Sequence, residues 1–237
     1  MNFLNKQYTQ EGLKLALPVM LTQVGQVSVN LFDNIIVGKL LGAQALASVS
    51  LGNGLFFSIF VLALGFSFAI PPLVSEANSQ KKHDVINSVF RHGFVINLGI
   101  GTLLMIILLA ALPLIYHLDQ PKEIIPNTIS FLSIMAFTMI PFMMFQTLRE
   151  VSEGLSFTIG VTKATIIANV INIALNYVFI KGLFGLPAMG VQGSALATLI
   201  ARIFMVVFLY FVLVKEPKTR RYIKEFSLKI SLFTKEM

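Results

Sequence analysis

The feature that most constrains this chain is a series of apolar segments, each long enough to cross a membrane as a helix. A crossing helix needs about 20 predominantly apolar residues. The sequence contains six such segments, at roughly 13–38, 45–70, 93–115, 127–148, 162–181 and 190–214. Only 12% of the residues are charged, against about 25% in typical soluble domains. We therefore expect an all-α polytopic membrane protein with six helices, in which only the connection at 75–91 is a long polar loop.

The positive charges predict how this bundle lies in the membrane. If the helices alternate in direction, fourteen of the 18 Lys and Arg fall on the side of both termini and three on the other, while Arg202 lies inside the sixth helix. Cytoplasmic loops are enriched in Lys and Arg, so both termini are expected in the cytoplasm. This division also explains the net charge of +7 without nucleic acid as a partner. Residues 1–214 would form the membrane domain and 215–237 a basic tail, either an interdomain linker or an interfacial amphipathic helix.

A polar stripe runs along the first helix and ends in a carboxylate. Gln23, Gln26, Asn30 and Asp33 follow at i, i+3, i+7 and i+10, which places them on one helix face. An ionisable group at membrane depth is costly, so it is expected to face a bundle interior or a wet cavity. Asp33 is therefore the first candidate for a functional residue.

Other helices offer polar edges at a matching depth. At ~1.5 Å per residue, several polar side chains lie within one layer of the outer half of the bundle. These residues are Asp33, Asn53, Asn172, Asn176, Ser194 and Thr198. A single carboxylate among neutral amide and hydroxyl oxygens suits Na⁺ or a proton. We therefore expect a cation site at Asp33, Asn172 and Asn176, to which Thr198 or Ser194 adds a hydroxyl.

A substrate cavity is expected beside this site. Its candidate lining residues are Gln23, Gln26, Asn30, Asn53 and Arg202. Gln23 and Gln26 could instead hold helices together, since interhelical hydrogen bonds in membranes contribute about 0.6 kcal/mol each. Arg202 could pair with a carboxylate, extend toward the inner surface or contact substrate.

Three further features complete the expectations from residue types. Pro18 and Pro141 lie within helices and should bend them, because proline removes a backbone hydrogen bond. Arg149 and Glu153 are spaced for a solvated i, i+4 salt bridge. The sequence contains no catalytic triad, phosphate-binding loop or metal-ligand cluster, so we expect a protein that is not an enzyme and that has no cofactor beyond a coupling ion.

Five stretches of the chain resemble the multidrug and toxic compound extrusion (MATE) transporters in order and spacing. They are LALPVMLTQ (15–23), FDNIIVGKLLGAQALASVSLG (32–52), TLREVSEGLS (147–156), NVINIALNYVFIKG (169–182) and GVQGSALATLIAR (190–202). The resemblance implies two six-helix lobes facing a central cleft, of which this chain would be the amino-terminal lobe. It also implies export of organic cations, driven by Na⁺ or H⁺, across the inner membrane of a bacterium.

The resemblance assigns roles to individual residues. Asp33, Asn172 and Asn176 match the cation site, and Pro18 matches a proline at which the first helix bends. Where some family members carry a second carboxylate, this chain has Asn176, which leaves the coupling ion open. The implied partners are lipid, a small organic substrate and a second lobe from the same chain or a homodimer. The alternatives are a flippase for lipid-linked saccharides, which would need more cationic cavity residues, and a truncated bundle that does not transport.

Overall fold

The computed structural model describes residues 6–224. Within this range the chain is almost entirely helical and has no strand. The helices are α1 (Lys6–Leu41), α2 (Ala43–Ser67), α3 (Ile70–Ser79), α4 (His83–Ala111), the 3₁₀ helix η1 (Leu112–His117), α5 (Ile125–Phe137), α6 (Met139–Gly154), α7 (Ile159–Lys181), α8 (Gly190–Lys215) and α9 (Pro217–Lys224). The all-α fold expected from the sequence is confirmed.

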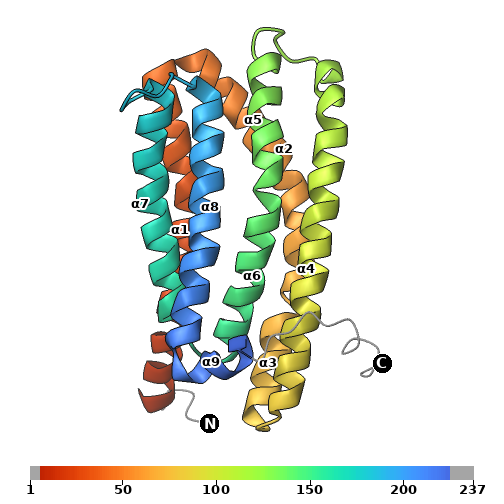
Figure 1. The fold of residues 1–237 in the computed structure, drawn as a ribbon, viewed down its shortest axis with the longest axis vertical. Helices are drawn as coiled ribbons and strands as arrows, with labels where there is room; N and C mark the ends of the chain where they lie inside the picture. Colours follow the sequence, from red (N-terminus) through yellow and green to blue (C-terminus); the bar gives the residue numbers. More distant parts are fainter. Residues whose placement is uncertain (1–5, 225–237) are drawn as a thin grey trace.

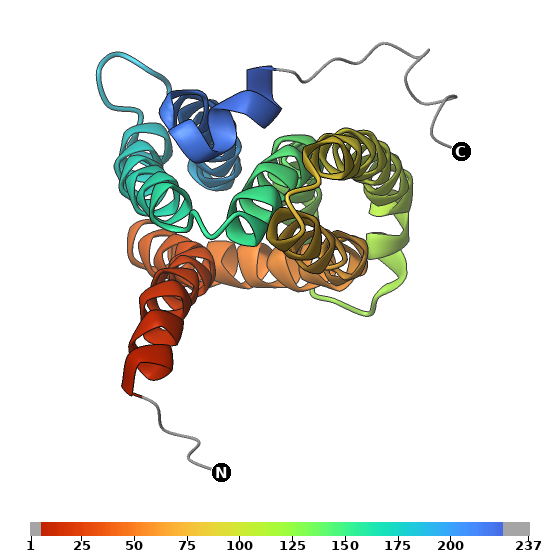
Figure 2. The same cartoon turned by 90° about the horizontal axis from the view of Figure 1, so that it is seen from below.

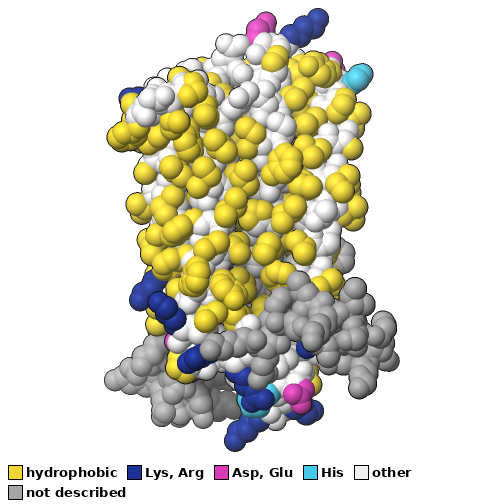
Figure 3. Space-filling view, in the orientation of Figure 1, with side chains coloured by type: hydrophobic (Ala, Val, Ile, Leu, Met, Phe, Trp, Pro, Cys, Tyr) yellow, Lys and Arg dark blue, Asp and Glu magenta, His cyan; other side chains and the backbone are white. Residues whose placement is uncertain are grey.

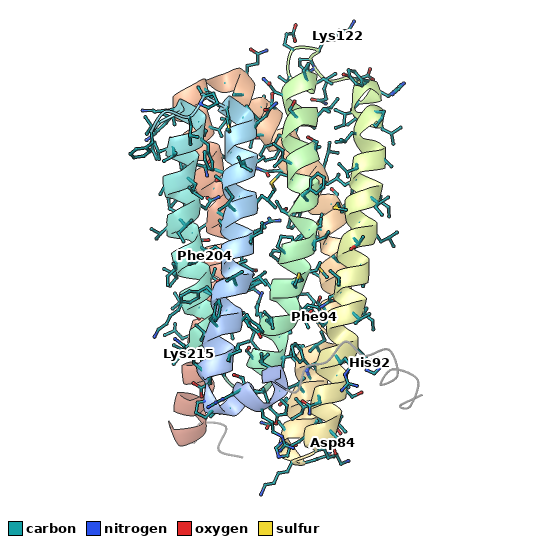
Figure 4. All side chains as sticks on the ribbon, viewed as in Figure 1. Asp84, His92, Phe94, Lys122, Phe204 and Lys215 are labelled. Carbon is teal, nitrogen blue, oxygen red and sulfur yellow. The ribbon has the colours of Figure 1, made fainter. Side chains whose placement is uncertain are left out.

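The long helices form an elongated bundle (Figure 1). α1, α7 and α8 lie on one side, α2 and α4 lie on the other, and α5 and α6 run between them. The described chain begins and ends at the same end of the bundle, together with α3 and α9, and we call this the terminal end. The opposite end, where Lys122 lies (Figure 4), is called the distal end.

The surface of the bundle fits a membrane environment. A broad apolar band covers the visible face, and Lys and Arg gather mainly at the terminal end (Figure 3). Four segments of the described chain are long and apolar enough to span a membrane, or five if the bent pair α5 and α6 is one span. α1 has 36 residues but is not among them. Six crossings and cytoplasmic termini therefore stay predictions.

The prediction of a long polar loop at 75–91 is wrong. Residues up to Ser79 belong to α3 and those from His83 belong to α4, so only three residues lie between the helices. Both helices are amphipathic at this end, and Val74, Ile86 and Phe90 are buried in one apolar cluster. The remaining polar residues made the segment look like a loop, although they only mark helices that continue past the apolar band.

The two internal prolines differ in effect. α5 and α6 meet at Thr138 with a bend of 41°, three residues before Pro141. Pro141 has no N–H to donate to the carbonyl of Phe137, so the helix breaks there. The bend predicted at Pro141 is therefore confirmed. At Pro18, α1 continues as one helix; the first turns of α1 lean away from the other helices (Figure 2).

Close approach of three helices positions the polar residues described below. α7 packs most extensively against α8 and then against α1. A Cβ on Gly193 would lie 2.8 Å from a backbone atom of Phe179, and one on Gly25 would lie 2.9 Å from Cγ2 of Thr165. Only glycine lets the backbones approach this closely, as is common where membrane helices pack.

The chain after α8 turns back onto the terminal end. Thr219 Oγ1 donates to the carbonyl of Leu213 at 2.7 Å, and the Tyr222 hydroxyl lies 2.7 Å from Nδ1 of His83 at the start of α4. The rest of the basic tail, including Phe226 and Ile230, whose spacing suggested the interfacial amphipathic helix, lies outside the described residues. The boundary between a membrane domain at 1–214 and a tail at 215–237 stays a prediction.

Candidate functional site

Asp33 is buried where α1 meets α7 and α8, with 4% of its surface exposed. Asn176 Nδ2 donates to Asp33 Oδ1 at 2.7 Å, and Thr198 Oγ1 donates to Oδ2 at 3.1 Å. Asn172 Nδ2 donates to Thr198 Oγ1 at 3.1 Å, so the hydroxyl is fixed between the two helices. We call Asp33, Asn172, Asn176 and Thr198 the distal cluster. The structure brings together the carboxylate, both asparagines and one of the two hydroxyls that the sequence proposed.

The oxygen atoms of the distal cluster fit a monovalent cation. Asn176 Oδ1 is buried without a described hydrogen-bond partner, and the same holds for the hydroxyl of Ser194. A buried acceptor without a donor is costly, and a bound cation would satisfy it. Ser194 differs from Thr198 because its hydroxyl has no described contact with Asp33, while its carbonyl lies 3.1 Å from Thr198 Oγ1 and competes with Asp33 Oδ2 for the single hydrogen of that hydroxyl.

A ladder of polar contacts ties α1 to α7 along their length. Residues of α7 seven positions apart reach successive positions on α1, which runs parallel to it. Thr162 Oγ1 donates to the Pro18 carbonyl at 2.9 Å, Asn169 Nδ2 to the Gly25 carbonyl at 2.7 Å, and Asn176 Nδ2 to Asp33 at 2.7 Å. The Pro18 carbonyl also accepts from Thr22 Oγ1 at 2.9 Å. The contact between Asn176 and Asp33 is therefore the last in a series of hydrogen bonds between α1 and α7 that begins at the Pro18 carbonyl.

A cavity of about 200 Å³ opens beside the distal cluster. Gln23, Gln26, Asn30, Asn53 and Arg202 all line it, as do Asn172 and Thr198 of the distal cluster. Asp33 is not a lining residue, since both of its oxygens turn toward α7 and α8. Phe56, Phe57, Phe60 and Phe142 form an aromatic wall. The residues proposed for a substrate cavity thus share one cavity.

Arg202 is fixed in the wall of this cavity. Its Nη1 donates to Thr138 Oγ1 at 2.5 Å, and its guanidinium carbon lies 5.1 Å from the ring centroids of both Phe56 and Phe142. Cation–π contacts of this kind contribute about 0.5–2 kcal/mol each. Within the described chain no carboxylate forms an ion pair with Arg202, so the pairing that the sequence left open is not the arrangement found.

A second polar group lies nearer the terminal end. Arg149 Nε donates to Glu153 Oε1 at 2.7 Å, and its Nη1 donates to Gln26 Oε1 and Gln146 Oε1, each at 3.3 Å. We call these four residues the terminal cluster. The predicted ion pair is confirmed, but the expectation of a solvated pair is wrong: Arg149 is 3% exposed, because α3, α4 and α8 pack against α6. Beside it, Glu150 is 2% exposed and both of its carboxylate oxygens lack a described partner.

Several residues of these networks were missed from the sequence. Thr162 could have been found, because Thr162, Asn169 and Asn176 repeat every seven residues. Phe56 and Phe142 carry no such signal, since aromatic residues are common throughout these helices. The contact of Thr138 with Arg202 could not be predicted from the sequence either, because the position of Thr138 depends on the break between α5 and α6.

Comparison with known proteins gives a consistent set of relatives. A family model described as MatE matches residues 18–178. The chain is 33% identical over 195 residues to the multidrug resistance protein NorM of Photobacterium profundum, covering 82% of this chain and 42% of that protein. It is 30% identical over 198 residues to the multidrug resistance protein MdtK of Yersinia pestis, covering 83% and 43%.

Solved structures agree with this at the level of the fold. The crystal structure of the eukaryotic MATE transporter AtDTX14 superposes with a TM-score of 0.84 at 17% identity, covering 96% of this chain and 50% of that one. A MATE crystal structure in the bent conformation gives 0.79 at 22% identity, covering 93% and 49%. The chain spans about half the length of these proteins and less than half the length of the two curated relatives.

Proposed function

Because the chain belongs to the MATE family, we propose that it forms one lobe of a cation-coupled exporter of organic, drug-like compounds. The observation that carries this proposal is the lone carboxylate of Asp33, buried where three helices meet and held by neutral donors from α7 and α8. A buried carboxylate with neutral hydrogen-bond donors can be neutralised by one proton or one monovalent cation.

In this proposal the coupling ion binds within the distal cluster. The oxygen ligands would be those of Asp33, Thr198 and Asn176, whose unpartnered Oδ1 supports the assignment. Oxygen donors with one negative charge suit Na⁺, and the same carboxylate could instead carry H⁺. Binding at Asp33 would alter its hydrogen bonds to Asn176 and Thr198. The packing of α1 against α7 and α8 would change as a result.

Pro18 would serve as the bending point of α1. The polar ladder to α7 begins at its carbonyl and ends at Asp33, so a change at one end alters the packing of the helix between them. A bend of α1 would change the shape of the cavity that Gln23, Gln26 and Asn30 line. Binding of the ion would therefore release the substrate from the cavity.

The remaining parts of the proposal concern the surroundings of the chain. The relatives with curated names are bacterial multidrug resistance proteins, and we place this protein in a bacterial inner membrane, with lipid around the apolar band. The second lobe would come from the same chain or from a homodimer. The export of organic cations implied by the resemblance stays a prediction. A flippase would need more cationic groups in the cavity, and Arg202 is the only charged residue of the described chain that lines it.

Transport in vesicles with Na⁺ and pH gradients imposed separately tests the proposal. Asp33→Asn, in the complete transporter, is expected to abolish gradient-driven extrusion of a fluorescent dye, because an amide can neither carry the proton nor neutralise the cation. Asp84→Asn is the matched control: it makes the same change on the exposed start of α4 (Figure 4) and should leave extrusion intact. Undiminished extrusion by well-expressed Asp33→Asn would refute the proposal.

A further inference from the structure

The cavity of this lobe has an unexpected charge. Arg202 is a permanent cation, and among the described residues no carboxylate lines the cavity with it. Asp33 attracts Arg202 electrostatically but forms no direct ion pair with it, because its two oxygens are engaged by Asn176 and Thr198. The free space of this lobe is therefore bounded by one positive group, neutral amides and aromatic rings.

The orientation of the Arg202 guanidinium is fixed by its neighbours. Thr138 Oγ1 donates to the Met135 carbonyl at 2.6 Å, so this hydroxyl is oriented to accept from Arg202. Phe56 and Phe142, which are 5% and 4% exposed, lie against the guanidinium and leave it little freedom to turn. Arg202 donates one described hydrogen bond and lines the cavity, so other N–H groups of its planar fork are available to an acceptor.

We infer that Arg202 binds the carboxylate of an aromatic organic acid or zwitterion in this lobe. This inference rests on the proposed export function and names a substrate group for the same cavity. A guanidinium matches a carboxylate by two parallel hydrogen bonds, which gives both affinity and orientation. The four phenylalanine rings of the cavity wall provide the apolar surface that an attached aromatic ring would cover.

The size of the cavity limits which part of the molecule lies here. Cavities for drug-sized ligands are about 300–1,000 Å³, whereas a cavity of about 150 Å³ holds a benzene molecule. At about 200 Å³, this one holds a ring system with its acidic group. The rest of a larger substrate, including any cationic group, would extend toward the second lobe.

The test compares three ligands of equal shape on the complete transporter, purified in detergent without any ion gradient. They are 2-naphthoate, the neutral 2-naphthamide and the cationic 2-naphthylmethylammonium, with binding measured by equilibrium dialysis. Hydrogen bonds to charged groups change affinity by about tenfold to a hundredfold. We expect naphthoate to bind at least about tenfold more tightly than either of the others.

Variants assign that preference to Arg202. Arg202→Gln should remove the preference for naphthoate while the amide binds as before, which also shows that the cavity is intact. Lys215→Gln, a matched loss of an exposed cation on the same helix (Figure 4), should leave the preference unchanged. If Arg202→Gln does not fold, Thr138→Val keeps the cation but frees it to turn, and it should reduce the preference several-fold.

Two results would overturn the inference: tighter binding of the ammonium compound than of naphthoate, or a preference for naphthoate that survives Arg202→Gln. These outcomes are separate from those of the export proposal. Loss of extrusion in Asp33→Asn together with no naphthoate preference removes only the present inference. Naphthoate preference together with full extrusion by Asp33→Asn removes the coupling mechanism and leaves the binding site.

Discussion

The distal and terminal clusters both join α1 to other helices through buried charged groups, but their charges are balanced differently. In the distal cluster, the hydrogen-bond donors to Asp33 are neutral, at 2.7 and 3.1 Å, and the charge of Arg202 acts on it without a direct ion pair. In the terminal cluster, Arg149 meets the opposite charge of Glu153 directly, at 2.7 Å. A balanced pair has no reason to exchange an ion, whereas an unbalanced carboxylate can be neutralised by one. The comparison therefore separates a region that stabilises the fold from the region where we propose that a coupling ion binds.

The largest effect on stability is expected at Arg149. Arg149→Met leaves the carboxylate of Glu153, whose side chain is 16% exposed, without its partner, and the cost should be about 3 kcal/mol, the lower end of the range for a broken buried pair. The double variant Arg149→Met/Glu153→Leu removes both charges and should restore the free energy of unfolding to within about 1 kcal/mol of the original. Unfolding of the complete transporter by SDS titration in mixed micelles measures both values. A double variant as unstable as the single one would show that the pair is more than a fixed link.

A smaller effect, on ion binding instead of stability, distinguishes the two hydroxyls of α8. Thr198→Val removes the hydrogen bond to Asp33 Oδ2 and should weaken binding of the coupling ion by about tenfold to a hundredfold. Ser194→Ala should change it by less than about threefold, because no described contact joins the Ser194 hydroxyl to Asp33, whereas Thr198 donates to that carboxylate. The concentration of ion that gives half-maximal dye extrusion reports both variants. Equal losses at the two positions would mean that Ser194 turns toward the ion when it binds.

The distal cluster could be predicted further from the sequence than the terminal one. Helical periodicity and distance from the helix ends placed Asp33, Asn172 and Asn176 in one layer, and the observed hydrogen bonds fall in that layer. Rotation of α8 about its axis was not predictable, since Ser194 and Thr198 lie one turn apart on the same face. Only the packing of α8 against α1 brings the hydroxyl of Thr198, and not that of Ser194, to Asp33.

The terminal cluster shows what local spacing leaves out. The i, i+4 pattern predicted the pair of Arg149 and Glu153, yet its burial depends on packing by α3, α4 and α8, and Arg149 also donates to Gln26, which is 123 residues away in the chain. The same limit applies to α3 and α4, whose polar residues were read as a loop because no local signal revealed the apolar cluster beneath them. Axial position follows from the sequence of one helix, whereas burial follows from its neighbours.

Glu150 belongs neither to the distal cluster nor to the terminal cluster. Its replacement should give the smallest change in the free energy of unfolding, but the direction of that change distinguishes it from Glu153. Its two carboxylate oxygens are buried without a described partner, while its neighbour Arg149 is committed to Glu153. Burial of this carboxylate opposes folding more than the attraction of Arg149 favours it, so Glu150→Gln should leave the free energy of unfolding unchanged or raise it by about 1 kcal/mol. Glu153→Gln, the matched change three residues later on the same helix, should lower it, because it strands Arg149. If Glu150→Gln instead lowers the stability as much as Glu153→Gln does, Glu150 belongs to the balanced cluster, and the distinction between the two regions must then rest on Asp33 alone.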